Sequence, residues 1–181
     1  MMIYEHLEHY LGPILQGWGT DENDLNIEVS LFREPDKQGI NTFSTLGLNK
    51  RVLPMGGKAV RQEFIFAAYE RYLVDDVSSF LMTFAEYIAK KSIGLLRGDF
   101  IEGPALIEGA SVTGVYASIP VFWPEGIQVF ENTSPHTVLV WLIPITHSEA
   151  VVIREKGWQY FEKLLEKSDC DFWDLNRNTV M

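Results

Sequence analysis

The pattern of hydrophobic and polar residues predicts a domain rich in β-strands. Residues 26–33 alternate, with Ile27, Val29 and Leu31 on one face and polar residues on the other, which is typical of a half-buried strand. Residues 137–145 are apolar on both faces, which indicates a central strand of the sheet. The same criteria, bounded by turn residues, predict strands at 26–33, 41–49, 60–69, 112–119, 127–131 and 137–145.

Helical periodicity predicts further elements between these strands. A short amphipathic helix ends at Gly12 and Pro13. A longer helix begins after Asp75 or Asp76, either of which can cap it, and Gly94 lies just past its end. One continuous apolar stripe on the longer helix consists of Val77, Phe80, Leu81, Phe84 and Ile88.

The last helix has a recognisable beginning. Residues 146–149, with the sequence THSE, form a predicted capping box, because the threonine hydroxyl and the glutamate carboxylate can each bond the other residue's backbone N–H. Gly157 interrupts the apolar pattern that follows and costs about 1 kcal/mol relative to alanine, which predicts a kink or a helix in two pieces. The polar tail at 168–181 contains Phe172 and Trp173, and we expect it to dock at least partly.

Segments without periodicity are predicted to be loops. They include the acidic segment 17–24, which holds Trp18, the turn at 34–39 and the irregular segment 95–107. Since only a turn separates the first two strands, they are expected to form a hairpin. Strands interleaved with separated helices predict an α+β fold, with a twisted, mostly antiparallel sheet and about three helices packed against it. No repeat or linker interrupts the pattern, so residues 1–181 are predicted to form a single domain.

Composition indicates a globular protein of a reducing compartment. Aromatic residues make up 13% of the chain, which is too many for a disordered segment and enough for a core. Cys170 is the single cysteine, so neither an intramolecular disulfide nor a Cys-rich zinc site can form. The N-terminal segment does not resemble a signal peptide, and no stretch of sequence is long and apolar enough to cross a membrane. We therefore expect a cytoplasmic protein without membrane association.

The net charge constrains the kind of partner. At −10 it repels nucleic acid and anionic lipid, and it would favour a basic protein and speed its approach. The alternative interpretation is that acidity only keeps the protein soluble.

No catalytic or metal-binding constellation can be recognised in the sequence. Residues 55–58 resemble a phosphate loop only superficially, because Val52 and Ala59 stand where that motif needs a glycine and a hydroxyl. His6 and His9 share a helix face, but without an obvious third ligand a solvated helix surface is favoured over a metal site. We predict a protein that is not an enzyme, with no catalytic residues, no metal and no cofactor.

Aromatic side chains near carboxylates are the candidates for contact with a protein partner. Tryptophan is frequent among the residues that anchor protein interfaces. The alternative is that these rings cap the open ends of the sheet, since tryptophan is usually well buried. The candidate partner-binding residues are Trp18, Asp21, Glu22, Asp24, Phe122, Trp123 and Glu125.

Four stretches, taken in order, resemble the N-terminal domain of the suppressor of fused family. Each is weakly specific alone, but the ordered set covers most of the chain. The stretches are residues 41–49 (NTFSTLGLN), 61–66 (RQEFIF), 98–99 followed by Pro104, and 144–149 (PITHSE) running on to Gly157 and residues 161–162.

The resemblance implies a protein-binding function. Short bacterial members that this sequence is similar to are thought to be immunity proteins that neutralise toxins, many of which are basic nucleases. The animal domain binds a peptide, so a strand added to the sheet is one mode that the resemblance implies. The alternatives are a regulatory or scaffold domain for an endogenous protein, and a small-molecule binder or enzyme built on carboxylates. The partner's identity and the oligomeric state stay open.

Overall fold

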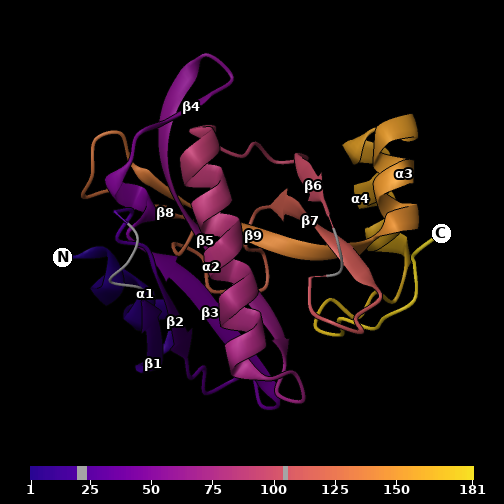
Figure 1. The fold of residues 1–181 in the computed structure, drawn as a ribbon, viewed down its shortest axis with the longest axis horizontal. Helices are drawn as coiled ribbons and strands as arrows, with labels where there is room; N and C mark the ends of the chain where they lie inside the picture. The colour runs from indigo at the N-terminus through magenta and orange to yellow at the C-terminus, as the bar shows by residue number, and fades with distance from the viewer. Residues whose placement is uncertain (20–23, 104–105) are drawn as a thin grey trace.

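The computed structural model describes residues 1–19, 24–103 and 106–181 (Figure 1). The helices are α1 (Ile3–Leu11), α2 (Val74–Lys91), α3 (His147–Lys156) and α4 (Trp158–Lys167), with a short 3₁₀ helix η1 (Leu48–Lys50). The strands are β1 (Ile14–Gly19), β2 (Glu28–Phe32), β3 (Ile40–Leu46), β4 (Leu53–Met55), β5 (Lys58–Tyr69), β6 (Phe100–Glu102), β7 (Val112–Ser118), β8 (Val129–Phe130) and β9 (Thr137–Thr146).

All of these strands belong to one sheet. Its main path runs β1-β2-β3-β5-β9-β7-β6, while β4 pairs with β5 and β8 pairs with β9. Paired strands are antiparallel except β5 and β9, which are parallel. The predicted α+β class, the mostly antiparallel sheet and the hairpin of β2 with β3 are confirmed. Among the described residues the helices number four rather than about three, because the last helix is split.

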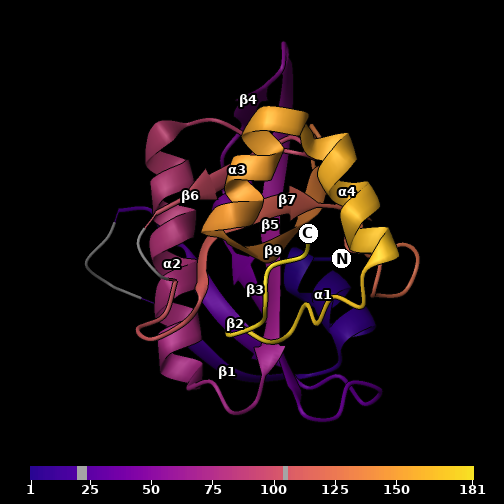
Figure 2. The same cartoon turned by 90° about the vertical axis from the view of Figure 1, so that its right-hand side faces the viewer.

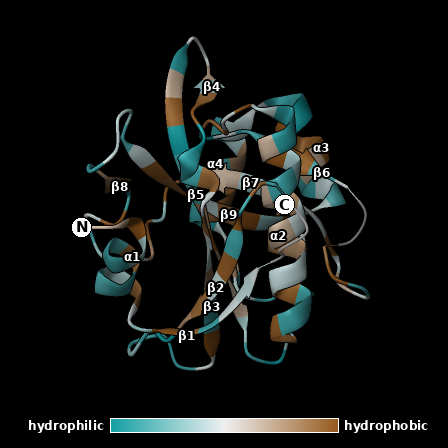
Figure 3. Ribbon diagram, turned by 60° about the vertical axis from the view of Figure 1, so that its left-hand side comes forward, coloured by the Kyte–Doolittle hydropathy of each residue, from teal (hydrophilic) through white to brown (hydrophobic). Residues whose placement is uncertain are grey.

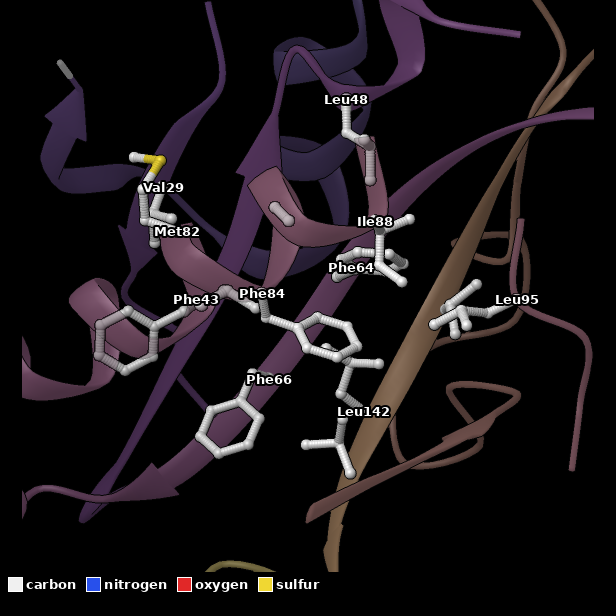
Figure 4. Close-up of a cluster of buried hydrophobic side chains, with 14 of the residues drawn as sticks. Val29, Phe43, Leu48, Phe64, Phe66, Met82, Phe84, Ile88, Leu95 and Leu142 are labelled. Atoms are coloured by element: carbon white, nitrogen blue, oxygen red, sulfur yellow. The ribbon is translucent and has the colours of Figure 1, made fainter. Parts of the chain in front are cut away.

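Helices cover both faces of the sheet and create two cores. α2 lies on one face, and α1, α3 and α4 lie on the other (Figure 2). Under α2 the rings of Phe64 and Phe84 have centroids 5.5 Å apart, and Phe43, Phe66 and Leu142 surround them (Figure 4). Burying one such side chain contributes roughly 1.5–3 kcal/mol, so this core holds α2 firmly on the sheet.

The central strands alternate between these two cores. In β5, Phe64 and Phe66 point to the α2 side, whereas Ile65 and Ala67 point to the side of the other helices. Successive side chains of a strand face opposite ways, so a strand buried on both faces has to be apolar throughout. This confirms the central position predicted for residues 137–145. The helices need only one apolar face, and Figure 3 shows α1 and α2 with both hydrophilic and hydrophobic bands.

Three short strands lie where the sequence pattern predicts loops. β1 occupies the first part of the predicted acidic loop, so Trp18 lies in a strand, opposite Val29 of β2. β4 and β6 lie in other segments without clear alternation. Predicted boundaries also change, because residues 127–131 form only the two-residue strand β8.

The caps of α2 differ from the prediction. Leu73 is the N-cap residue and makes no side-chain cap bond, whereas Asp75 and Asp76 lie in the first turn. Negative charge there still stabilises a helix through its dipole. At the other end Ser92 takes the left-handed conformation with φ 53°, so α2 stops before Gly94.

The C-terminal tail docks, as predicted, and closes a split in the sheet. β5 and β9 pair only as far as Ile65 and Trp141, and beyond that point they separate. The Trp173 carbonyl accepts a hydrogen bond from the backbone N–H of Tyr69 at 3.0 Å, and the Leu175 carbonyl accepts one from Ser111 at 3.1 Å. The tail thereby connects the end of β5 to the start of β7.

The predicted capping box at the start of α3 is also confirmed. The Thr146 hydroxyl accepts from the backbone N–H of Glu149 at 3.4 Å, and the Glu149 carboxylate accepts from the backbone N–H of Thr146 at 2.9 Å. Gly157, with φ 86°, ends α3 and precedes α4, which is the predicted helix in two pieces.

We expect Thr146→Ala to lower the free energy of unfolding by about 1 kcal/mol, because the N–H of Glu149 loses its acceptor. Thr146→Ser keeps the hydroxyl and is expected to lose much less. Urea denaturation followed by circular dichroism measures both variants. Equal losses for alanine and serine would contradict a role for the hydroxyl.

Candidate functional site

Trp18, a predicted contact residue, is half-buried rather than free. Its indole N–H donates to Asp75 of α2 at 2.9 Å, and its ring lies 6.1 Å from that of Phe43. Trp18 therefore fastens β1 to α2 on the α2 side of the sheet. Of its predicted acidic neighbours, Asp24 is exposed, and Asp21 and Glu22 lie outside the described residues.

Trp123 does not form the exposed anchor that the sequence suggests. It is only 5% exposed, and its indole N–H donates to Glu34 at 3.1 Å. Phe122 is 47% exposed and packs edge-on against Trp141 and Trp173. The alternative in which rings cap the sheet thus describes Trp123 correctly, while Phe122 keeps an accessible edge.

The predicted contact residues do not form one surface. Trp18 packs on the core beneath α2, whereas Trp123 belongs to the core on the opposite face. Glu125 is exposed, two residues after Trp123. Any partner that used Phe122 and Glu125 would therefore meet a different face from one that used Trp18.

A groove lies between α2 and the residues that follow β6. Its volume is about 640 Å³, within the range of roughly 300–1,000 Å³ that is usual for binding pockets. Phe84 and Val115 form part of its floor, and Tyr87 of α2 and Ile107 of the opposite segment form part of its walls. Figures 1 and 2 both show α2 running beside β6.

Glu102 stands on the rim of this groove in a small charged network. Its carboxylate accepts from Arg154 at 3.0 Å and from His147 at 2.8 Å, both on α3. Burial acts in the opposite direction, but these hydrogen bonds prevail and hold the pKa of Glu102 below its usual value. Glu102 therefore stays ionised near neutral pH.

A second, smaller hollow lies on the same sheet near the end of β7. Its volume is about 290 Å³, and most of its lining residues are apolar, including Leu96, Ile119 and Val129. Each of these side chains is partly exposed. Arg97 also lines it, but its guanidinium is paired with Glu162, so this hollow offers little to orient a ligand.

The described residues do not bring together side chains for metal chemistry. Within 1–19, 24–103 and 106–181, no group of three or more His, Cys, Asp or Glu residues is placed to hold an ion. Burial, together with nearby carboxylates, raises the pKa of the Cys170 thiol to about 11, so this thiol is a poor nucleophile. Across the same three ranges, every helix is too short or too polar to cross a bilayer.

The groove was missed from sequence because its two walls are far apart along the chain. One wall is a side of the well-predicted helix α2, and the other follows a three-residue strand in a segment without periodicity. Two signals could have indicated it: Tyr87 lies outside the core stripe of α2, and the apolar pair Leu106 and Ile107 stands in an otherwise irregular segment.

The fold is that of the suppressor of fused proteins. A crystal structure of a SUFU homologue from Neisseria gonorrhoeae superposes with a TM-score of 0.81 at 15% identity, covering 99% of this chain and 94% of that one. The crystal structure of a Sufu–Fu complex superposes with a TM-score of 0.75 at 12% identity, covering 98% of this chain and 90% of the other.

Sequence comparison then gives the family. Residues 23–178 match the family model of the suppressor of fused protein (SUFU), and the chain belongs to this family. It is also 21% identical over 180 residues to the immunity protein YqcF of Bacillus subtilis, an alignment that covers 93% of this chain and 89% of YqcF. The resemblance inferred from the ordered stretches is therefore confirmed.

Proposed function

We propose that this chain is a cytoplasmic, non-enzymatic immunity protein that binds and neutralises a cognate toxin. The observation that carries the proposal is its similarity to the immunity protein YqcF, which extends over nearly the whole of both chains. The net charge of −10 supports a basic toxin as the partner, because opposite charge speeds association and strengthens encounter.

A second function is favoured by a different observation. The Sufu–Fu complex contains a relative of this fold together with another protein. This supports a regulatory or scaffold domain that binds an endogenous protein instead of a toxin. Both functions require a protein-binding surface, and neither requires catalysis.

A toxicity-rescue assay separates these functions. Proteins encoded next to this gene are expressed one at a time in a sensitive host, with and without the chain. We expect one of them to stop growth and the chain to restore it, and the pair to co-elute from a sizing column. Arg177→Ala, which should not fold stably, is the negative control.

Two outcomes would count against the proposed toxin. If no neighbouring product is toxic and the tagged chain co-purifies from its native cell with a housekeeping protein, the regulatory function replaces the immunity function. If the purified chain turns over a substrate through residues whose removal leaves the fold intact, both binding functions fail.

A further inference from the structure

The groove beside α2 combines an apolar floor with open access. Phe84 and Val115 are buried at its base, and Phe80 and Ile101 are partly buried above them. Tyr87 stands at the wall and is 43% exposed. An apolar side chain entering here would leave water for contact with aromatic and branched aliphatic groups, which favours binding.

The rim of the groove carries negative charge. Its charged lining residues are Asp76, Glu102 and Glu108, and no lysine or arginine of the described chain lines it. Arg154 and His147 partly compensate Glu102, but Asp76 and Glu108 are exposed and form no ion pair with any described residue. A ligand that fills this groove therefore meets uncompensated negative charge at two places on the edge.

The apolar floor and the acidic rim together limit which segments can bind. The rim would repel an acidic segment, and a purely polar basic segment would leave the apolar side chains of the floor in contact with water. A segment that alternates large apolar side chains with lysine or arginine satisfies both requirements. The negative charge of the whole chain disfavours a second copy as the occupant.

We propose that the groove between α2 and residues 101–103 and 106–108 receives a short basic and apolar segment of the protein partner. The apolar side chains of that segment lie on Phe80, Phe84 and Val115, and its cationic groups lie beside Asp76 and Glu108. This site rests on the proposed function only in requiring that the partner be a protein.

Titration with defined peptides tests the site without the natural partner. The probe is the synthetic peptide KLFKKLFK, and its matched controls are KSSKKSSK, with the same charge, and ELFEELFE, with the same apolar residues. In methyl-labelled chain we expect KLFKKLFK to shift the signals of Ile101, Leu106, Ile107 and Val115. Loss of the apolar anchors or reversal of charge should each weaken binding at least about tenfold.

Two variants in the groove and one control variant on α3 test whether the peptide binds at this site. Thr83→Trp, from an exposed position of α2, fills the groove, and Glu108→Lys reverses its rim; both should abolish the methyl shifts while circular dichroism stays unchanged. Glu155→Lys, at an exposed position of α3, makes the same change of charge elsewhere and should bind as the wild type does.

Three results would overturn the site. Equal binding of KLFKKLFK and KSSKKSSK would mean attraction to surface charge alone. Shifts confined to Ile119 and Val129 would place the peptide in the smaller hollow. A dimer in sedimentation that Thr83→Trp converts to monomer would assign the groove to a second copy. None of these results bears on the toxin-rescue assay, so failure of the groove and failure of the immunity function are separate outcomes.

Discussion

Arg177→Ala is expected to lower the free energy of unfolding by about 3–5 kcal/mol, enough to unfold a domain of ordinary stability. Arg177 is 6% exposed and Glu149 is fully buried. The guanidinium donates to both carboxylate oxygens of Glu149, at 2.6 and 2.7 Å, and to the Pro144 carbonyl at 2.8 Å. Without arginine, the Glu149 carboxylate stays buried with no positive charge beside it to offset its desolvation.

The size of this loss follows from the position of Glu149. Besides Arg177, its carboxylate accepts from the backbone N–H groups of Thr146 and Val180, both at 2.9 Å. One side chain therefore caps α3 and holds the C-terminal tail. Since the tail also connects β5 to β7, breaking the ion pair loosens the closure of the split sheet as well.

Chemical denaturation of three variants checks the prediction. Arg177→Lys keeps the charge but not the two parallel hydrogen bonds, and we expect a loss between those of wild type and Arg177→Ala. Arg154→Ala breaks the ion pair with Glu102 at a half-exposed guanidinium, where such pairs contribute at most about 1 kcal/mol. Similar losses for Arg154→Ala and Arg177→Ala would show that burial does not decide the effect.

The pairing of Glu149 with Arg177 illustrates what the sequence can and cannot predict. The capping box is a local pattern within four residues, so its geometry follows from the order of residues alone. Arg177 lies in a polar tail with no periodicity, 28 residues further along the chain. Its partner is set by how the tail crosses the sheet, and no pattern in the tail encodes that path.

Burial explains which strands can be predicted from the sequence and which cannot. Central strands bury both faces, so hydrophobic side chains mark β5 and β9 clearly. β1 and β6 lie at the two ends of the sheet and bury little, so hydrophobic side chains do not mark them. The candidate site depends on β6 and the segment after it, and for this reason the groove was harder to predict than the core.

The predicted contact residues show the limit of composition as a guide to surfaces. Trp123 is a candidate because tryptophan often anchors interfaces, but its indole N–H donates to Glu34 and its ring packs in a core instead. The same amphipathic character suits both roles. Only the arrangement of the sheet decides between them, and here it buries Trp123 and leaves the edge of Phe122 accessible.

Glu63→Gln is expected to remove a pH dependence of stability on the order of 3 kcal/mol between about pH 4.5 and pH 7. Glu63 is fully buried in β5, and burial raises its pKa from 4.5 to about 7, although Thr45, Gly47 and Asn49 donate hydrogen bonds to it at 2.5, 2.7 and 3.0 Å. The folded protein therefore holds this proton more tightly than the unfolded chain does.

The sign of the effect follows from this difference. Below pH 4.5 both states are protonated and the contribution of Glu63 to stability is fully present. As the pH rises to about 7, the unfolded chain has already released the proton while the folded protein keeps it or carries a buried charge, so this contribution is lost. The glutamine side chain has no proton to release in this pH range. The stability of the Glu63→Gln variant should therefore not depend on pH through position 63.

Urea denaturation at pH 5, 6, 7 and 8 measures the difference. We expect the wild type to lose stability across this series relative to Glu63→Gln, which starts lower by about 1 kcal/mol because an amide cannot accept all three bonds. Glu155→Gln, on the exposed surface of α3, should follow the wild type at every pH. Parallel curves for Glu63→Gln and wild type would mean that the three donors outweigh burial, and that Glu63 is already ionised in the folded protein at pH 5.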